Sequence, residues 1–104
     1  MTVTIAGVTI PDTTLVKEAT ELVRDVEDDL LFNHSRRAYA WGAALAALDG
    51  VSFDRELLYL AAMFHDTGLP SPVPGVDFTV RSAAMARGFI GDRLPVAERE
   101  VVTN

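Results

Sequence analysis

Apolar residues recur at helical spacing in several separate stretches of this chain. In the first stretch they are three or four positions apart, at Leu15, Ala19, Leu22 and Val26. This spacing predicts one apolar face of an amphipathic helix. Asp12 or Thr13 can cap its start. The acidic run Asp25–Asp29 that follows either ends this helix or begins the next one, because acidic residues favour a helix N-terminus.

The same pattern predicts further helices over residues 30–48, 55–65 and 79–90, with a fifth starting near Pro95. Gly50 is a plausible stop for the second helix, and Asp54 can cap the third. The second helix is rich in alanine, which lets neighbouring helices approach closely, so we expect it to be central. The third is apolar on nearly every side and is expected to be buried.

The N-terminal residues 1–11 lack this helical spacing and have the composition of extended structure. They carry β-branched residues at Val3, Ile5, Val8 and Ile10, interrupted by Gly7. A small hairpin around Gly7 fits this pattern and would have to lie on the helices, because an isolated hairpin is only marginally stable. The predicted fold class is therefore all-α, a bundle of about five helices with a short extended N-terminal segment. An α/β fold would need several more buried strands.

Composition narrows the class of protein. The chain has 104 residues, of which 49% are hydrophobic, as expected for one soluble domain. It has no cysteine, which excludes disulfides, thiolate zinc sites and cysteine nucleophiles. A net charge of −6 argues against nucleic-acid and anionic-membrane partners. No targeting signal or membrane-spanning run is visible, so we expect a cytoplasmic protein.

Both histidines lie in unusual surroundings. His34 falls near the start of the second predicted helix, and His65 stands beside Asp66 at the end of the third. Neighbours on a helix point about 100° apart and would not normally share an ion, but at a helix end the backbone can deviate, so that His65 and Asp66 converge. His34 is the only other histidine, and its helix would have to cross the third helix near that end. Imidazole and carboxylate ligands suit divalent Fe, Mn, Zn, Co or Ni.

A structural interpretation stands beside this one. A lone histidine among apolar residues is commonly a hydrogen-bonded core residue, and an aspartate before Thr67-Gly68 is an ordinary helix terminus. A metal-free four-helix bundle would also fit the periodicity. The occurrence of both histidines in such contexts, one of them followed by Asp66, favours a metal site.

The sequence resembles the HD-domain superfamily of metal-dependent hydrolases, and within it the bacterial branch related to cyanamide hydratase. Two motifs carry the resemblance, Asn33-His34-Ser35-Arg36-Arg37 and Ala62-Met63-Phe64-His65-Asp66-Thr67-Gly68. The stretches 5–12, 19–25 and 53–59 are also similar to that branch, so the resemblance covers most of the chain to about Phe89.

The resemblance implies a metal held between core helices, with His34, His65 and Asp66 as three of the four signature ligands. Asp66 is then the candidate catalytic residue. The implied reaction uses a metal-activated water on a small phosphate ester or on a nitrile-like substrate. Arg36 and Arg37 are candidate substrate-binding residues. Their alternative role is a solvated helix face or an ion pair with the acidic run.

Two features depart from the family pattern. The final signature aspartate lies well downstream of the His-Asp pair, and after Asp66 this chain offers only Asp77 and Asp92. Thr79 and Arg81 stand where relatives in the branch carry acidic residues. We therefore expect residues 1–104 to form a single HD-like domain without the family's C-terminal helices. The alternatives are a catalytically silent helical module that binds a partner, a fragment of a longer protein, and a homodimer that covers exposed apolar faces.

Overall fold

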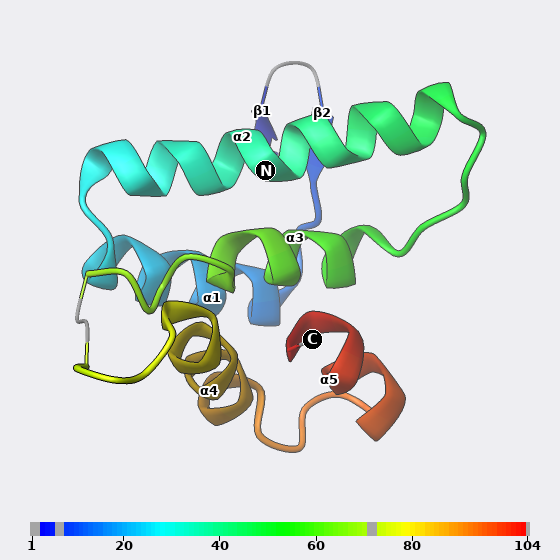
Figure 1. Cartoon of the computed structure of the whole chain (residues 1–104). Helices are drawn as coiled ribbons and strands as arrows, with labels where there is room; N and C mark the ends of the chain where they lie inside the picture. Colours follow the sequence, from blue (N-terminus) through cyan, green and yellow to red (C-terminus); the bar gives the residue numbers. More distant parts are fainter. Residues whose placement is uncertain (1–2, 6–7, 71–72, 104) are drawn as a thin grey trace.

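A computed structural model describes residues 3–5, 8–70 and 73–103 of the chain. Within these residues two short strands precede five helices, which confirms the predicted all-α class (Figure 1). The elements are β1 (Val3–Ile5), β2 (Val8–Ile10), α1 (Thr14–Val26), α2 (Asp29–Leu48), α3 (Arg55–Phe64), α4 (Phe78–Ile90) and α5 (Val96–Thr103).

The two strands form the antiparallel hairpin that the β-branched residues predicted. Val3 pairs with Ile10, and the hairpin lies against α2 and α3. The hydroxyl of Tyr39 on α2 donates a 2.7 Å hydrogen bond to the carbonyl of Thr9, and Ile10 is buried. The hairpin therefore depends on the helices for its stability. The predicted turn residue, Gly7, lies outside the described residues.

Helix α1 starts where the sequence predicts, but the face that it buries differs slightly from the predicted one. Thr13, not Asp12, is the N-cap, because its Oγ1 accepts a 3.1 Å hydrogen bond from the backbone of Val16. The fully buried positions are Val16, Ala19 and Val23, whereas Leu15 and Leu22 are only partly buried. The apolar face is therefore centred one residue further along the chain than the prediction placed it.

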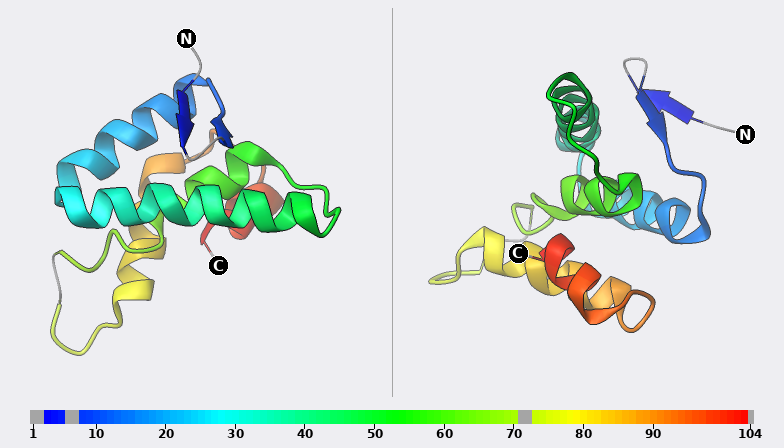
Figure 2. Two further views of the ribbon diagram at one scale, coloured as in Figure 1. Left: turned by 90° about the horizontal axis from the view of Figure 1, so that it is seen from above. Right: turned by 90° about the vertical axis from the view of Figure 1, so that its right-hand side faces the viewer.

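Helix α3, and not the alanine-rich α2, is the central element. α3 packs against α1, α2, α4 and α5, and the views agree that α2 lies on one side of it and α4 and α5 on the other (Figures 1 and 2). The prediction of a central α2 was wrong: alanine permits close packing on several faces of α2, but only Ala40 and Ala43 of its alanines are buried. The outer face of α2 leaves Trp41 70% and Leu48 82% exposed.

Helix α4 approaches the end of α3 at Gly68. The backbone N–H of Gly68 donates a 2.8 Å hydrogen bond to Ser82 Oγ. A Cβ atom at this position would lie 2.3 Å from the carbonyl oxygen of Phe78, so only glycine permits the approach. Asp77, the N-cap of α4, accepts from the backbone of Thr79. These contacts fix the chain directly after Asp66.

Candidate metal centre

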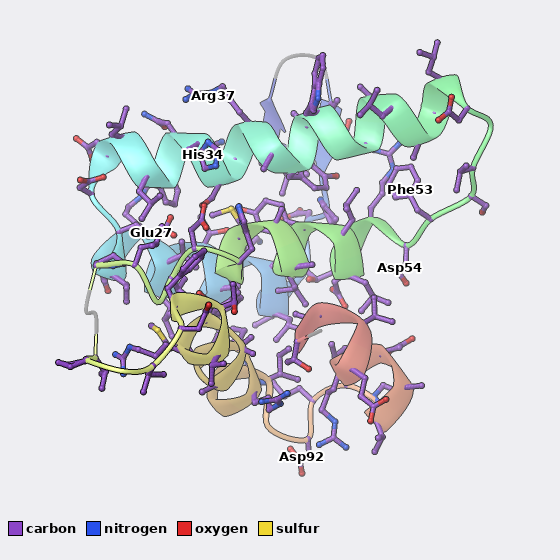
Figure 3. All side chains as sticks on the ribbon, viewed as in Figure 1. Glu27, His34, Arg37, Phe53, Asp54 and Asp92 are labelled. Carbon is purple, nitrogen blue, oxygen red and sulfur yellow. The ribbon has the colours of Figure 1, made fainter. Side chains whose placement is uncertain are left out.

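Helices α2 and α3 bring the two histidines and Asp66 together. One ligand atom of each of His34, His65 and Asp66 lies within 4.8 Å of the others. Asp66 Oδ2 is 2.9 Å from His65 Nε2 and 3.4 Å from His34 Nε2. Figure 3 shows His34 on α2 above the C-terminal end of α3. The crossing that the sequence required is therefore present.

The backbone after α3 turns in the way that lets adjacent side chains converge. His65 is the C-cap of α3, and its N–H still donates to the carbonyl of Ala61. The N–H of Thr67 then donates to Phe64 O, and the Thr67 hydroxyl donates to the same carbonyl at 2.8 Å. Thr67 is fully buried. A tight, well-packed turn thus holds His65 and Asp66 in place.

One hydrogen bond determines how His65 faces Asp66. Nδ1 of His65 contacts the carbonyl oxygen of Ala62. A carbonyl only accepts, so Nδ1 carries the proton, and in a neutral ring Nε2 then presents a lone pair to Asp66 Oδ2. Two acceptors 2.9 Å apart are stable only with a proton or a cation between them. Metal-ligating histidines commonly donate their second ring nitrogen to a backbone carbonyl in this way, so the residues present fit a divalent ion.

The group formed by His34, His65 and Asp66 is accessible to solvent. The side chain of Asp66 is 12% exposed, whereas those of His34 and His65 are 57% and 42% exposed. Three protein ligands with an accessible side are typical of catalytic metal sites, whereas structural sites are closed by a fourth protein ligand.

Sequence reasoning missed a buried carboxyl group beside the centre. Glu27, assigned to the acidic run, is only 5% exposed and accepts a 3.1 Å hydrogen bond from the hydroxyl of Ser35, the residue after His34. Burial raises the pKa of Glu27 from its usual 4.5 to about 7, the Ser35 hydrogen bond acts in the opposite direction, and the charge of Asp66 raises it further. The signal was present, since Glu27 continues the helical spacing of the buried residues Val16, Ala19 and Val23.

The two arginines after His34 lie on different sides of α2. Arg37 shares an open hollow of about 590 Å³ with His34 and Trp41. Arg36 lines a different cavity, and its guanidinium lies 5.6 Å from the centre of the Phe32 ring. A turn of about 200° separates residues two positions apart on a helix, which explains why Arg36 faces away from His34. In the described part of the chain neither arginine forms an ion pair with the acidic run.

The later aspartates lie outside the group of ligands. Asp77 caps α4, and hydrogen bonds from Thr79 lower its pKa. Asp92 lies between α4 and α5, far from His34 (Figure 3). Across residues 3–5, 8–70 and 73–103, neither joins His34, His65 and Asp66. Thr79 instead lines a cavity of about 160 Å³ beside His65, together with Ser82 and Thr103.

One comparison with known protein families found a match that spans the three residues of this group. Residues 31–102 match the family model of the HD domain, a span that includes His34, His65 and Asp66. No curated protein and no solved structure matches the chain. None of the described helices combines the length and the apolar character that crossing a membrane requires.

Proposed function

This chain belongs to the HD domain family, and from that membership we propose that it is a metal-dependent hydrolase or hydratase acting on a small phosphate ester or nitrile-like substrate. The observation that supports the proposal best is the convergence of His34, His65 and Asp66 from two helices within 4.8 Å. Family membership supports metal-dependent hydrolytic chemistry in general. The choice of substrate rests on the surroundings of the site.

The three side chains would hold a divalent transition metal through His34 Nε2, His65 Nε2 and Asp66 Oδ2. When bound, such an ion polarises the substrate and lowers the pKa of water towards 7. The chain's own groups orient the ligands: the carbonyl of Ala62 holds the His65 ring, and the buried turn at Thr67 holds Asp66. Asp66, the least exposed of the three, is the candidate catalytic residue.

Two features beside the centre support different substrates. Arg37 lies in the same hollow as His34 and can bind the negative charge of a phosphate ester. The small cavity beside His65 is lined by the hydroxyl-bearing residues Thr79, Ser82 and Thr103, and its volume of about 160 Å³ suits a small neutral molecule such as cyanamide. Both substrate classes therefore belong in the test.

The test is turnover of p-nitrophenyl phosphate, nucleoside monophosphates and cyanamide with added Mn, Fe, Co, Ni or Zn. We expect turnover with at least one metal, its loss with EDTA, and a decrease of about 100-fold or more in His65→Ala. Asn33→Ala is the matched control, because Asn33 is an exposed neighbour of His34 on the same helix. Turnover that is unchanged in His65→Ala contradicts the proposal.

A second candidate is a catalytically silent HD-type module that binds a protein partner. It is favoured by the position of Asp77 and Asp92 outside the ligand group and by Thr79 and Arg81 in place of acidic residues. Under this hypothesis His65→Ala changes stability or partner binding, and no substrate of the panel is turned over with any metal.

A further inference from the structure

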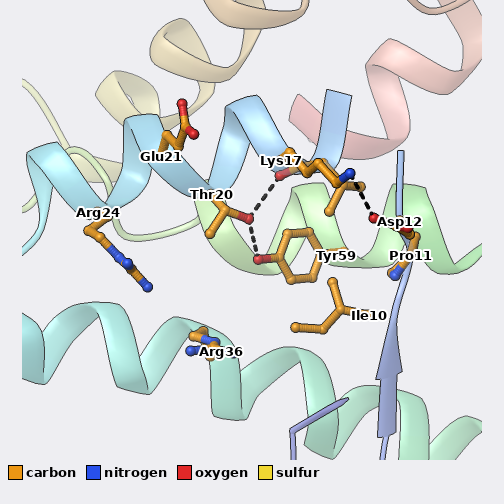
Figure 4. A pocket seen from close by; sticks show the side chains of 10 residues that line it. Ile10, Pro11, Asp12, Lys17, Thr20, Glu21, Arg24, Arg36 and Tyr59 are labelled. Atoms are coloured by element: carbon orange, nitrogen blue, oxygen red, sulfur yellow. Dashed lines mark hydrogen bonds and ion pairs between the residues drawn. The ribbon is translucent and has the colours of Figure 1, made fainter. Parts of the chain in front are cut away.

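A third cavity lies on the side of α2 that faces away from His34. It is an open pocket between α1, α2, α3 and β2 with the segment that follows it, and its volume is about 420 Å³ (Figure 4). Ile10, Val16 and Tyr59 line it with apolar surface, while Arg24 and Arg36 stand at one end. A cavity of this size, mostly apolar with a few convergent polar groups, is typical of small-molecule sites.

Among the residues that the structure describes, the two arginines in this cavity have no acidic partner. Their guanidinium carbons lie 4.8 Å (Arg24) and 5.6 Å (Arg36) from the centre of the same Phe32 ring. Within the described residues no carboxylate is within ion-pair distance of either group, and Nε of Arg36 is buried without a hydrogen-bond partner. The chain has 15 acidic and 9 basic residues, so carboxylates are not scarce.

The other charged groups of the cavity do not neutralise the pair. Lys17 is 3.0 Å from Asp12 and forms an ion pair with it. Glu21 is exposed, and Figure 4 shows its carboxylate pointing away from Arg24 and Arg36. Two positive charges therefore remain at one end of the cavity.

Tyr59 does not neutralise them either. Its hydroxyl lies 2.6 Å from Thr20 Oγ1, and because the Thr20 hydroxyl donates to the carbonyl of Val16, Tyr59 is the donor in this contact. Burial raises the pKa of Tyr59, although the charges of Arg36 and Arg24 act in the opposite direction. The phenol is thus neutral, and both guanidinium groups lie within electrostatic range of it.

We propose that this cavity binds a small organic anion. Its carboxylate or phosphate group would lie between Arg24 and Arg36, whose planar donor groups match such oxyanions. Its apolar body would pack against Ile10, Val16 and Tyr59. The site is separate from the metal centre, because Arg36 and His34 project from opposite sides of α2.

The test is a titration of ¹⁵N-labelled protein in EDTA with benzoate, with phenylphosphonate, whose P–C bond is not hydrolysed, and with neutral benzyl alcohol. We expect at least one anion to bind about tenfold or more tightly than benzyl alcohol and to shift the amide resonances of Thr20, Arg36 and Tyr59. The tighter anion identifies the preferred charged group. If neither anion binds, or if benzyl alcohol binds as tightly, the proposal is wrong.

Variants localise the binding. Arg24→Gln and Arg36→Gln should each weaken anion binding about tenfold, whereas Arg87→Gln, an exposed arginine on α4, should leave it unchanged. Arg24 is exposed, so Arg24→Gln provides the test even if Arg36→Gln does not fold. Parent-like affinity in Arg24→Gln overturns the proposal. His65→Ala should bind the anion normally, so a failure of the metal centre and a failure of this cavity give different results.

Discussion

At the scale of single residues, the environment of each side chain decides what it can do. The carbonyl of Ala62 orients the ring of His65. It holds the proton on Nδ1 and directs Nε2 towards Asp66. The sequence identified His34, His65 and Asp66 as a group because so few candidate ligands were available. It did not identify Glu27 as buried, because four acidic residues in a run of five indicate a solvated segment unless their helical phase is considered.

The buried carboxyl group of Glu27 predicts a pH dependence of stability. The folded carboxyl keeps its proton up to about pH 7, whereas the unfolded carboxyl loses it near 4.5. Between these values the unfolded state binds fewer protons, so the free energy of unfolding should fall as the pH rises. Glu27→Gln removes this contribution. Urea denaturation in EDTA between pH 4 and 8 should show the parent losing stability relative to Glu27→Gln across that interval.

The comparison with Glu27→Gln removes the contribution of the two histidines, which both proteins share. Asp25→Asn is the matched control, since Asp25 is an exposed acidic residue in the last turn of α1, two positions before Glu27, and its substitution should leave the pH profile of the parent unchanged. A constant difference in stability between parent and Glu27→Gln from pH 4 to 8 would contradict the assignment of a raised pKa.

At the scale of elements, the join between α3 and α4 determines where Asp66 lies. Helix spans were predictable, because caps such as Asp54 and the apolar spacing are local signals. The closeness of α4 to the turn after α3 was not, because Thr67-Gly68 reads in the sequence as an ordinary helix stop. The requirement for glycine at position 68 comes from the carbonyl of Phe78, a residue ten positions away in the sequence.

Two glycine substitutions test this join. Gly68→Ala should destabilise the fold by about 1–3 kcal/mol or more, because its Cβ would collide with the Phe78 carbonyl. Gly88→Ala, inside α4, should be neutral or stabilise by about 0.5–1 kcal/mol, because apart from its chain neighbours and the backbone of its own helix no described atom lies within 4 Å of the new Cβ. The measurement is the free energy of unfolding in urea. Equal effects of the two substitutions would show that the packing at Gly68 is not as described.

At the scale of the whole molecule, the order of the layers sets the location of the two cavities that border α2, one beside His34 and one beside Arg36. With α3 in the middle, the edge helix α2 presents His34 and Arg37 on one side and Arg36 on another. Which side of α2 faces the core could not be predicted from the sequence. Alanine at many positions of α2 allows close packing on several faces and does not indicate which of them is used. Only the contacts with α1, α3 and the hairpin decide it.

A metal held between α2 and α3 should stabilise the whole fold. An ion that binds the folded state alone adds about 2.7 kcal/mol at one hundred times its Kd, which corresponds to an increase in Tm of roughly 10 °C or more for a chain of this size. Differential scanning calorimetry with Mn, Co or Zn after removal of metal by EDTA measures it. His65→Ala should lose the increase and Asn33→Ala should keep it. The same increase in His65→Ala would place the ion elsewhere.

The most direct test of the central claim is an anomalous scattering experiment on crystals grown with Mn²⁺ or Zn²⁺. The account predicts one anomalous peak bonded to Nε2 of His34, Nε2 of His65 and a carboxylate oxygen of Asp66, at about 2.0–2.2 Å from each. An ion bound only at other residues, or no ion at this group in crystals saturated with the metal, would contradict it.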